Sequence, residues 1–351
     1  MRKRVAELLA ASEQVIKDCA KPNGAIVAAP SNKPHYPKEA KDYLYVWPRD
    51  AMYTCKAASI LGLDVTKKFL TWCMKAEGWS RTGLFYENYR INGKKARGHF
   101  QPDQTGSVLI TAHDHVLRGG DPAEVEKLVR NSADGLCKVW SEDHFTTVTQ
   151  DLWEERLCFP DIDKGFTYSL AICARGLTCA YDLYGEKEWQ RVAEQMRQAI
   201  PRDKDHYYRS GGKLPDHRVD ASLMGLLWPA GVVSAEDTRF RKTLQLIERR
   251  LAPDGGVHRY EHDEYDGWMY GKEHRKKGAG YWPVLNFWMA VCESEIGNRK
   301  KALSYYDKVL RDVNGRRLPE QVFDNDLQVP VKPLCWSHAM LVIATARLGL
   351  L

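Results

Sequence analysis

The sequence predicts an all-α fold in the form of an (α/α)6 barrel, and two observations support this prediction. Helical patterns recur along the 351 residues, whereas strand-like alternation is scarce. The links between successive helices alternate between short and long. In a ring of antiparallel helical hairpins, all links of one parity emerge at the same end. We therefore expect about twelve helices and a functional site at the long-loop end. The candidate helices span roughly 4–19, 50–62, 65–77, 104–118, 122–140, 166–184, 187–200, 219–228, 235–250, 282–296, 299–312 and 334–348.

Chemical start and stop signals support several of these helices. Asp121 and Pro122, with Glu124, combine an N-cap, a proline in the first turn and a capping box. Ser234 followed by Asp237 repeats the box pattern before the helix at 235–250. Four glycines stand where helices should stop, because glycine adopts the left-handed conformation that ends many helices: Gly62, Gly119, Gly185 and Gly297.

The helices fall into two kinds. Some are apolar or small on all sides, and others are strongly charged on one face. An inner ring of buried helices inside an outer amphipathic ring would produce this difference. The alternative is a helical solenoid, but no short repeat motif recurs between the hairpins. The apolar helices lie near 166–184, 219–228, 282–296 and 334–348, and the charged ones near 122–140, 187–200, 235–250 and 299–312.

Composition is ordinary for a globular protein, with 44% hydrophobic and 28% charged residues. We expect one catalytic barrel over residues 1–351, without an N-terminal β-sandwich domain. No apolar run approaches the roughly 18 residues of a membrane span. The start, "MRKRVAELLAASEQVIKDC", lacks the uninterrupted apolar core of a signal peptide and is typical of an amphipathic helix. These features predict a cytoplasmic protein without a membrane partner.

Cysteine usage and the charge distribution also fit the prediction of a cytoplasmic protein. The nine cysteines are odd in number and include no C-x-x-C pair, which indicates reduced core thiols. The net charge is +6, but the basic residues are spread along the chain. The tight interior run is "HRKK", residues 274–277. A solvated surface is therefore expected in preference to a nucleic-acid partner. Oligomeric state stays open.

The long loops hold the candidate functional residues. Each carries aromatic, arginine or carboxylate side chains where turn formers would suffice. Taken one at a time, these residues could have purely structural roles: Asp50, Asp103 and Asp220 stand at helix starts and could be N-caps. A functional site is favoured over separate structural roles, because the six loops are expected to converge at one open end of the barrel. The loops contain "DYLYVWPRD", "ENYR" with "GHFQPDQTG", "QDLWEER", "KLPDHRVD", "HRYEHDEYDG" and "RRLPEQVFD".

Sugar chemistry suits these residue types. Aromatic rings stack on the C–H faces of a sugar, and arginines and carboxylates hydrogen-bond its hydroxyls. The motifs of zinc proteases, nucleotide-binding loops and serine hydrolases are missing from the sequence, so neither metal nor cofactor is expected. A carboxylate pair acting on a sugar is the arrangement found in glycosidases.

Four segments, in order, resemble the catalytic barrel of glycoside hydrolase family 15, the glucoamylases and their relatives: "YLYVWPRDA", "DLWEE…FTYSLA", "HRYEHDEY" and "LPEQVFD…CWSHA". The resemblance spans nearly the whole chain. It implies an (α/α)6 barrel that removes terminal glucose from α-linked glucans with inversion. It assigns the general acid to Glu154 and the base that activates water to Glu320. Arg49 and Asp50 would hold the non-reducing terminal sugar.

The resemblance also implies a wider set of sugar-binding residues. Arg259 matches a sugar-contacting arginine, and five aromatic residues would support the pocket. Gln321 would help to hold the sugar, and Glu155 would be a hydrogen-bonding or pKa-setting neighbour of the acid. The expected substrate-binding residues are Tyr43, Trp47, Arg49, Asp50, Gln101, Asp103, Trp153, Glu155, Arg259, Tyr265, Trp282, Gln321 and Trp336.

Inversion requires an acid and a base on opposite sides of the sugar, with about 6.5–9.5 Å between their carboxyl groups. We expect partial burial beside Trp153, together with Asp151 and Glu155, to raise the pKa of Glu154. Glu320 should be ionised. The sequence departs from fungal members at "ARGHFQPD", where those proteins carry a tryptophan; an aromatic lid is expected here only if Phe100 takes its place. The trimmed loops favour a short substrate.

Several alternatives remain open. Within the family, the alternatives are a trehalase and an α-1,6-specific glucodextranase. From another class, the chain could be a non-catalytic sugar-binding or regulatory barrel, although it retains Glu154 and Glu320. An inverting phosphorylase uses phosphate in place of a base and water, so Glu320 counts against it.

Overall fold

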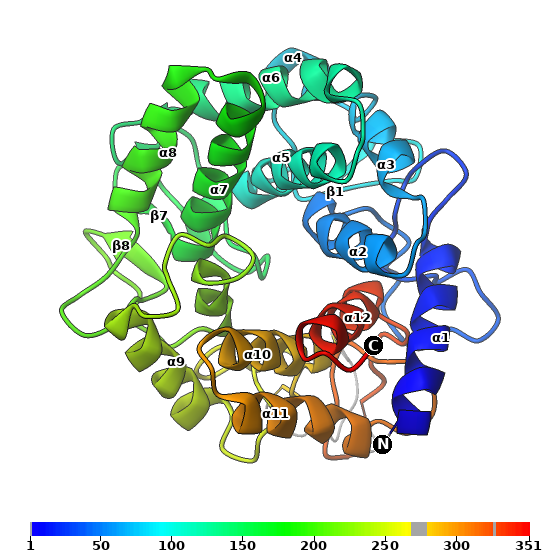
Figure 1. The fold of residues 1–351 in the computed structure, drawn as a ribbon. Coiled ribbons are helices and arrows are strands. Elements are labelled where there is room, and N and C mark those ends of the chain that lie inside the picture. The colour runs from blue at the N-terminus through cyan, green and yellow to red at the C-terminus, as the bar shows by residue number, and fades with distance from the viewer. Residues whose placement is uncertain (1, 268–278, 326–327) are drawn as a thin grey trace.

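The computed structural model describes residues 2–267, 279–325 and 328–351, and this part of the chain is mainly helical. The basic run at 274–277 lies outside the described residues. Helices form two concentric rings, seen end-on in Figure 1. Neighbouring inner helices contact each other in turn, and α12 returns to α2 to close the ring. The inner ring contains α2 (Pro48–Ile60), α5 (Pro102–Leu117), α7 (Thr167–Tyr184), η1 (Ala221–Leu226), α10 (Pro283–Glu295) and α12 (Cys335–Arg347); the outer ring contains α1 (Arg2–Cys19), α3 (Thr66–Cys73), α6 (Pro122–Lys138), α8 (Lys187–Ala199), α9 (Thr238–Leu251) and α11 (Arg299–Asp312).

The predicted all-α barrel is confirmed, with two differences in its helices. The helix expected at 219–228 is a short 3-10 helix, η1. Pro229 cannot continue a helix, and it disfavours helical geometry at the residue before it. A further helix, α4 (Trp79–Thr82), was not predicted. It lies between Gly78 and Gly83, which both have positive φ and confine it to one turn.

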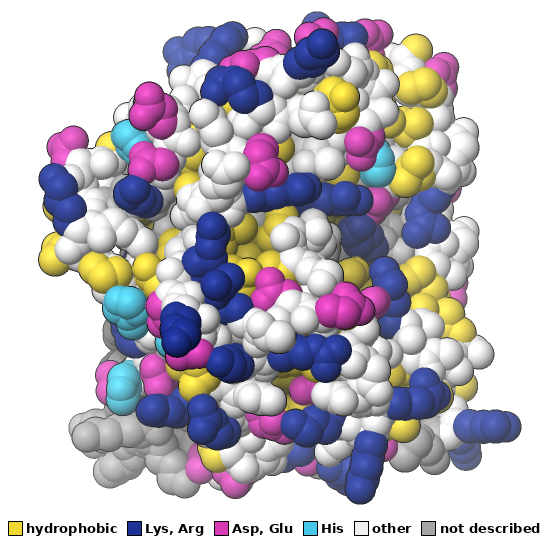
Figure 2. Space-filling model, turned by 60° about the vertical axis from the view of Figure 1, so that its left-hand side comes forward, with side chains coloured by type: hydrophobic (Ala, Val, Ile, Leu, Met, Phe, Trp, Pro, Cys, Tyr) yellow, Lys and Arg dark blue, Asp and Glu magenta, His cyan; other side chains and the backbone are white. Residues whose placement is uncertain are grey.

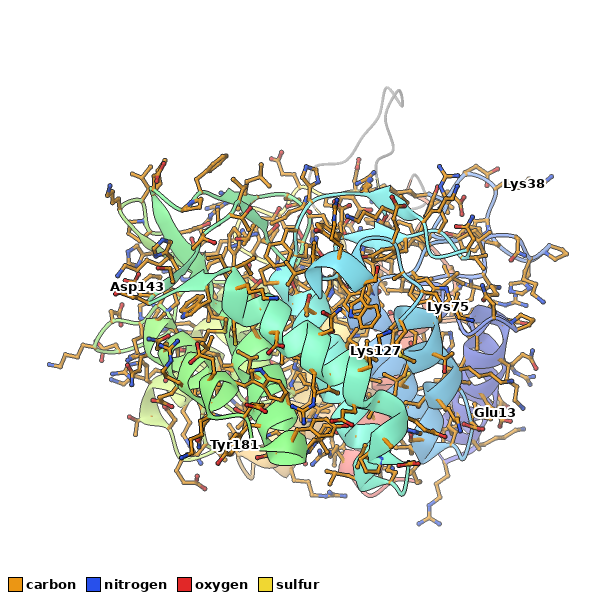
Figure 3. All side chains as sticks on the ribbon, turned by 90° about the horizontal axis from the view of Figure 1, so that it is seen from above. Glu13, Lys38, Lys75, Lys127, Asp143 and Tyr181 are labelled. Carbon is orange, nitrogen blue, oxygen red and sulfur yellow. The ribbon has the colours of Figure 1, made fainter. Side chains whose placement is uncertain are left out.

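Short turns and long loops separate to opposite ends of the barrel, as predicted. Figure 3 shows this from the side, with Lys38 at the loop end and Tyr181 near the end of α7 at the other. The loop end also carries short antiparallel strand pairs, which the sequence analysis missed because two to four residues are too few to show alternation. The pairs are β1 (Asn88–Tyr89) with β2 (Lys95–Arg97), β3 (Trp140–Ser141) with β4 (His144–Phe145), β5 (Thr149–Gln150) with β6 (Leu157–Cys158), and β7 (Asp163–Phe166) with β8 (Ser210–Gly212).

The helix ends follow most of the predicted signals. Asp121 caps α6 by accepting a hydrogen bond from the backbone N–H of Ala123. Ser234 does not start the next helix: Asp237 is the cap and accepts from Phe240, because its carboxylate reaches the N–H three residues on. The four predicted stop glycines follow inner helices and all have positive φ.

Two glycines bring the inner helices α5 and α7 into backbone contact. A Cβ atom on Gly106 would lie 2.6 Å from the carbonyl oxygen of Ile172. One on Gly176 would lie 2.8 Å from the carbonyl oxygen of Gly106. Both distances are below van der Waals contact, so any side chain would push the helices apart. The single hydrogen atom that glycine carries in place of a side chain lets the two helices approach closely, which keeps the inner ring narrow.

The surface carries mixed charges. Figure 2 shows Lys and Arg interspersed with Asp and Glu on one face, around a hollow lined by hydrophobic side chains. Eight of the nine cysteines are buried, as expected for core residues. Within the described ranges, no helix has the length and apolar character that a membrane span requires.

Candidate active site

A pocket of about 220 Å³ opens at the loop end of the barrel. Among the described residues, five of the six long loops line it. The fourth loop, 201–218, contributes no lining residue, contrary to the expectation that all six loops converge on the mouth. The predicted residues found in the lining are Tyr43, Trp47, Arg49, Asp50, Trp153, Glu154, Glu155, Arg259, Tyr265, Trp282, Glu320 and Trp336.

Glu154 stands on a strained turn. Its φ of 63° is in the left-handed region, which non-glycine residues rarely adopt. The turn is tied by Asp151, whose carbonyl accepts from the Glu154 N–H at 3.1 Å. One Asp151 carboxylate oxygen accepts from the backbone N–H groups of Glu155 and Arg156 at 2.9 and 3.0 Å. Strain of this kind persists where surrounding contacts impose it, and here it directs Glu154 into the pocket.

Few groups contact the carboxyl of Glu154. Trp47 donates its indole N–H to Oε1 at 2.5 Å. Arg49 Nη2 lies 3.9 Å from Oε1, and Arg97 Nη1 lies 4.0 Å from Oε2. Burial, followed by the like charge of Glu87, raises the pKa of Glu154 to about 8. Although 20% of the side chain remains exposed, the group stays protonated at neutral pH.

The expected cause of this raised pKa was partly wrong. Burial contributes as predicted, but the neighbouring carboxylate is Glu87 rather than Asp151 or Glu155. Asp151 is held by Arg209, and Glu155 by Arg259.

Glu320 enters the pocket from the loop between α11 and α12 and is 2% exposed. Tyr43 donates its hydroxyl to Oε1 at 2.9 Å. The other oxygen, Oε2, has no hydrogen-bond partner among the described residues. Burial raises the pKa of Glu320 to about 7, while the Tyr43 hydrogen bond and the charge of Arg259 act against this rise. Glu320 is therefore ionised above neutral pH rather than throughout the acidic range.

Arg49 and Asp50 form the polar floor at the start of α2. Arg49 Nη1 donates to Asp103 Oδ2 at 3.0 Å and to Gln101 Oε1 at 3.1 Å. Its Nε lies 3.5 Å from Asp50 Oδ2. Burial raises the pKa of Asp50 to about 6. Asp50 and Asp103 lie inside the first turns of α2 and α5, so they are not N-caps. Asp220, by contrast, caps η1 through the N–H of Ser222.

Three predicted substrate-binding residues do not line the pocket. Gln101 and Asp103 are fully buried behind Arg49 and hold its guanidinium. Gln321 is fully buried, and its Oε1 accepts from the Gly280 N–H at 3.0 Å. Each therefore supports a lining residue or a lining loop in this structure. The sequence cannot separate such residues from those that face the cavity, because both types sit beside the same motifs.

Arg259 lies inside an aromatic cage with two carboxylates. It donates to Asp263 at 2.7 and 2.8 Å and to Glu155 at 2.7 Å. Its guanidinium carbon is 4.7 Å from the ring centre of Tyr265. It lies 5.3 Å from the ring centres of both Trp153 and Trp282. Cation–π contacts and ion pairs together fix the arginine at one side of the pocket.

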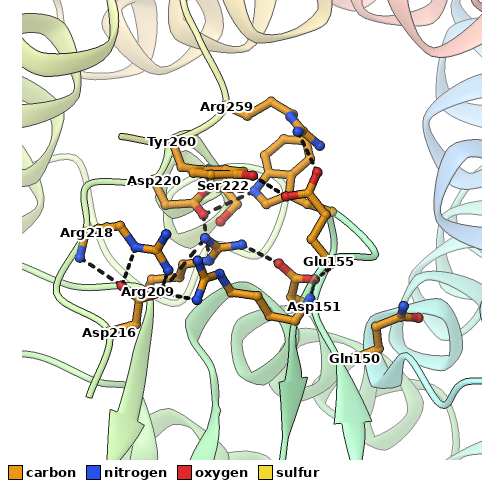
Figure 4. A network of polar contacts seen from close by, with 12 residues as sticks. Gln150, Asp151, Glu155, Arg209, Asp216, Arg218, Asp220, Ser222, Arg259 and Tyr260 are labelled. Carbon is orange, nitrogen blue, oxygen red and sulfur yellow. Dashed lines mark hydrogen bonds and ion pairs between the residues drawn. The ribbon is translucent and has the colours of Figure 1, made fainter. Parts of the chain in front are cut away.

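A buried network supports the "DLWEER" loop from the fourth loop (Figure 4). Arg209, on the fourth loop, is 3% exposed. It donates to Asp151 and lies 3.1 Å from Asp220. Asp220 in turn accepts from the Trp153 indole N–H at 3.1 Å, and Tyr260 donates to Glu155. The fourth loop therefore acts on the pocket indirectly, because Arg209 holds Asp151 directly and Trp153 through Asp220. Glu155 is held instead by Arg259 and Tyr260 of the fifth loop.

Sequence analysis missed the wall formed by residues 87–97. Asn88, Arg90 and Arg97 line the pocket, and Glu87 lies behind them. The segment "ENYR" was noted but given no role. Its signal was a glutamate beside short strand-like residues, which is also typical of a solvated turn. Lys41 also lines the pocket and was not predicted.

The pocket suits a polar ring-shaped ligand. Several buried polar atoms around it have no hydrogen-bond partner within the described part of the chain: Arg49 Nε, Asp50 Oδ2, Asn88 Oδ1, Glu320 Oε2, Trp282 Nε1 and Trp336 Nε1. Sugar hydroxyls both donate and accept hydrogen bonds, and indole faces suit the apolar face of a sugar ring. In residues 2–267, 279–325 and 328–351, no cluster of His, Cys, Asp or Glu has the arrangement of a metal site.

These features on an (α/α)6 barrel define a carbohydrate-active enzyme. The chain belongs to the glycosyl hydrolases family 15, whose family model matches residues 6–346. The family predicted from the sequence is thus confirmed.

Curated relatives cover much of the chain. It is 28% identical over 352 residues to an uncharacterized glycosyl hydrolase of Methanocaldococcus jannaschii, covering 91% of this chain and 52% of that protein. It is 26% identical to a trehalase of Mycolicibacterium smegmatis, covering 82% of this chain and 47% of that protein. The chain thus spans about half the length of these two relatives. It is 24% identical to an isomaltose glucohydrolase of Kribbella flavida, covering 99% and 94%.

Solved structures share the fold. A wild-type glycosidase superimposes with a TM-score of 0.80 at 23% identity, over 100% of this chain and 98% of that one. A bacterial glucoamylase complexed with acarbose gives a TM-score of 0.76 at 21% identity, over 97% of this chain and 55% of that one.

Proposed function

We propose that the protein is an exo-acting, inverting glycoside hydrolase that releases β-glucose from the non-reducing ends of α-linked gluco-oligosaccharides. The observation that carries this proposal is the pair of carboxyl groups in one pocket. Glu154 and Glu320 come from different loops, have different partners and both have raised pKa values. An acid and a base at separate positions are what inversion requires.

The chemistry follows from the two environments. Protonated Glu154 donates its proton to the glycosidic oxygen as the C–O bond breaks. Ionised Glu320 removes a proton from a water molecule as its oxygen attacks the anomeric carbon from the opposite face. Tyr43 orients Glu320 through Oε1, which leaves Oε2 available to the water. After each turnover, Glu154 regains a proton and Glu320 loses one.

The remaining lining residues would bind the terminal sugar. Arg49 and Asp50, at the N-terminus of α2, offer donors and an acceptor to its hydroxyls. Trp336, in the first turn of α12, and Trp282, just before α10, each have an indole N–H without a protein partner in the described residues. Recognition of a chain end by a fixed polar floor makes the enzyme exo-acting.

A short substrate is favoured by one comparison. The isomaltose glucohydrolase matches this chain over nearly its own full length, which supports an α-1,6- or α-1,4-linked oligosaccharide as substrate. Trehalose is the second candidate, because two relatives are trehalases, those of Mycolicibacterium smegmatis and Thermoplasma volcanium.

A substrate panel tests the proposal. The protein is incubated with maltose, isomaltose, panose, trehalose and soluble starch, and the anomers of the product are followed by proton NMR. Initial β-glucose from maltose, isomaltose or panose supports it, whereas release from trehalose alone supports the second candidate. Initial α-glucose would contradict inversion. If the wild type releases no more than E154Q and E320Q on the whole panel, the chain is better described as a sugar-binding barrel.

A further inference from the structure

We propose that Glu87 is a positioning residue that keeps the catalytic proton on Glu154. The inference rests on the proposed function and adds to it a residue that does not itself line the pocket. Glu87 precedes β1, and its neighbour Asn88 lines the same pocket as the "DLWEER" loop.

Glu87 is buried more completely than its partners. Its side chain has no exposed area, whereas those of Arg97 and His99 are 54% and 57% exposed. Arg97 Nη1 donates to Oε1 at 3.2 Å, and His99 Nδ1 lies 3.0 Å from Oε2. The Glu87 N–H donates to the His99 carbonyl at 2.9 Å, which fixes the backbone. Burying a carboxylate carries a large desolvation cost. If the ion pair between Glu87 and Arg97 only stabilised the hairpin, Glu87 would not need to be buried.

Glu87 and Glu154 share one cationic neighbour, Arg97. The same Arg97 nitrogen lies 3.2 Å from Glu87 Oε1 and 4.0 Å from Glu154 Oε2, so one guanidinium faces both. A second negative charge beside Glu87 is disfavoured, so the proton on Glu154 is retained.

The two carboxyl groups differ in their surroundings. Arg97 and His99 meet both oxygens of Glu87. Glu154 receives one neutral indole N–H, and its guanidinium neighbours are 3.9 and 4.0 Å away. Glu154 thus has fewer close donors than Glu87, and its raised pKa keeps its proton in place until a glycosidic oxygen takes it.

The other charged and titratable groups around Glu154 do not supply this effect. Arg49, Arg97 and Lys41 are cations and favour its ionised form, and the phenols of Tyr43 and Tyr265 are neutral near pH 7. After burial, Glu87 is the largest contributor to the raised pKa of Glu154. Removing the charge of Glu87 should thus release the proton at lower pH.

The pH profile of E87Q tests this role on the substrate that the panel identifies. The alkaline limb of kcat/KM should move down by about one pH unit, because a like charge is lost. The acid limb, set by Glu320, should stay in place. E87D keeps the charge and should restore the alkaline limb toward its wild-type position. E77Q removes a carboxylate whose Oε2 accepts from the Lys95 N–H of the same hairpin, and it should leave both limbs unchanged.

A second measurement does not depend on activity. In protein labelled with ¹³C at glutamate carboxyls, the signal lost in E154Q should titrate near pH 8 in the wild type. E87Q, or E87M if E87Q fails to fold, should lower that midpoint by about one unit. An unmoved midpoint and an unmoved alkaline limb would overturn the role of Glu87. Failure of the wild type to hydrolyse any sugar, with a lowered midpoint in E87Q, would instead count against the proposed function alone.

Discussion

Trp47 donates its indole N–H to Glu154 Oε1 across 107 residues of sequence, at 2.5 Å. Trp47 is the residue immediately before α2, and Glu154 stands on the strained turn of another loop. The hydrogen bond leaves Oε2 as the oxygen that can carry the proton. One donor therefore both orients the acid and acts against its raised pKa.

Replacing Trp47 with Phe should shift the alkaline limb of kcat/KM upward by about one pH unit. The reason is that a hydrogen bond to a charged group contributes about 1.5–3 kcal/mol, and its loss disfavours ionised Glu154. We also expect kcat to fall about tenfold as the acid loses its orientation. W336F is the control for the alkaline limb alone, because it removes a pocket indole N–H that has no protein partner in the described residues; its proposed sugar contact lets it lower kcat as well. A downward shift in W47F would contradict this reading of the bond.

The free enzyme should give a narrow bell-shaped pH profile of kcat/KM. The pKa of Glu320 is about 7 and that of Glu154 is about 8. Activity should fall below about pH 7, as Glu320 takes up a proton, and above about pH 8, as Glu154 loses one. Initial rates at low substrate concentration between pH 4 and 10 measure both limbs. An optimum near pH 5 would be incompatible with these two environments.

Substrates with different leaving groups should distinguish the substitution of Glu154 from that of Glu320. E154Q should lose at least about 100-fold activity on a disaccharide, which needs a proton on its leaving oxygen. Its loss on α-glucosyl fluoride should be about tenfold at most, because fluoride departs with little acid assistance. E320Q should lose about 1,000-fold on both, since both need an activated water. Near-full activity in E320Q would remove the base assignment.

Arg209→Met should destabilise the protein by about 3–5 kcal/mol at neutral pH, because it leaves buried carboxylates without their cation. Asp151 and Asp220 are almost fully buried beside it. The loss should shrink toward pH 4, where the freed carboxylates bind protons. Arg218→Met is the control: its partner Asp216 is shared with Arg209, and its own side chain is 27% exposed. Its cost should stay below about 1 kcal/mol in urea unfolding.

Gly176→Ala should destabilise the barrel by about 1–3 kcal/mol, because the new methyl group meets the backbone of Gly106. Gly98→Ala has no atom within 4 Å of the added Cβ and serves as the matched control. Thermal unfolding of the two variants measures the difference. Equal unfolding temperatures would show that the inner helices tolerate wider spacing.

The fold was largely predictable because its signals are periodic. Alternation of short and long links fixed both the ring and its functional end. The exception was 219–228, where the apolar pattern of a helix competes with Pro229 and the pattern alone cannot decide the helix type. The strand pairs escaped for another reason, since hydrogen bonding between two short loop segments leaves no periodic trace.

The site was predictable where a residue type is tied to a motif, as for Glu154, Glu320 and Arg49. The contacts that support these site residues were not predictable. Asp151 and Glu155 looked like the neighbours that raise the pKa of Glu154, but their arginine partners lie on other loops. Glu87 gave only an ambiguous signal in "ENYR", because its burial depends on a hairpin that folds over it. Long-range pairing of this kind cannot be read from local spacing.

The separation of turns and loops has a consequence for how this barrel can change. The hydrophobic core lies within the two rings, while the pocket is built from segments that leave the rings at one end and return. Loop length adds only a slowly growing entropic cost. New substrate preferences can therefore arise when whole loops at this end, such as residues 83–101, are exchanged between related enzymes. Such chimaeras should unfold at temperatures close to that of the parent, even where their sugar preference differs.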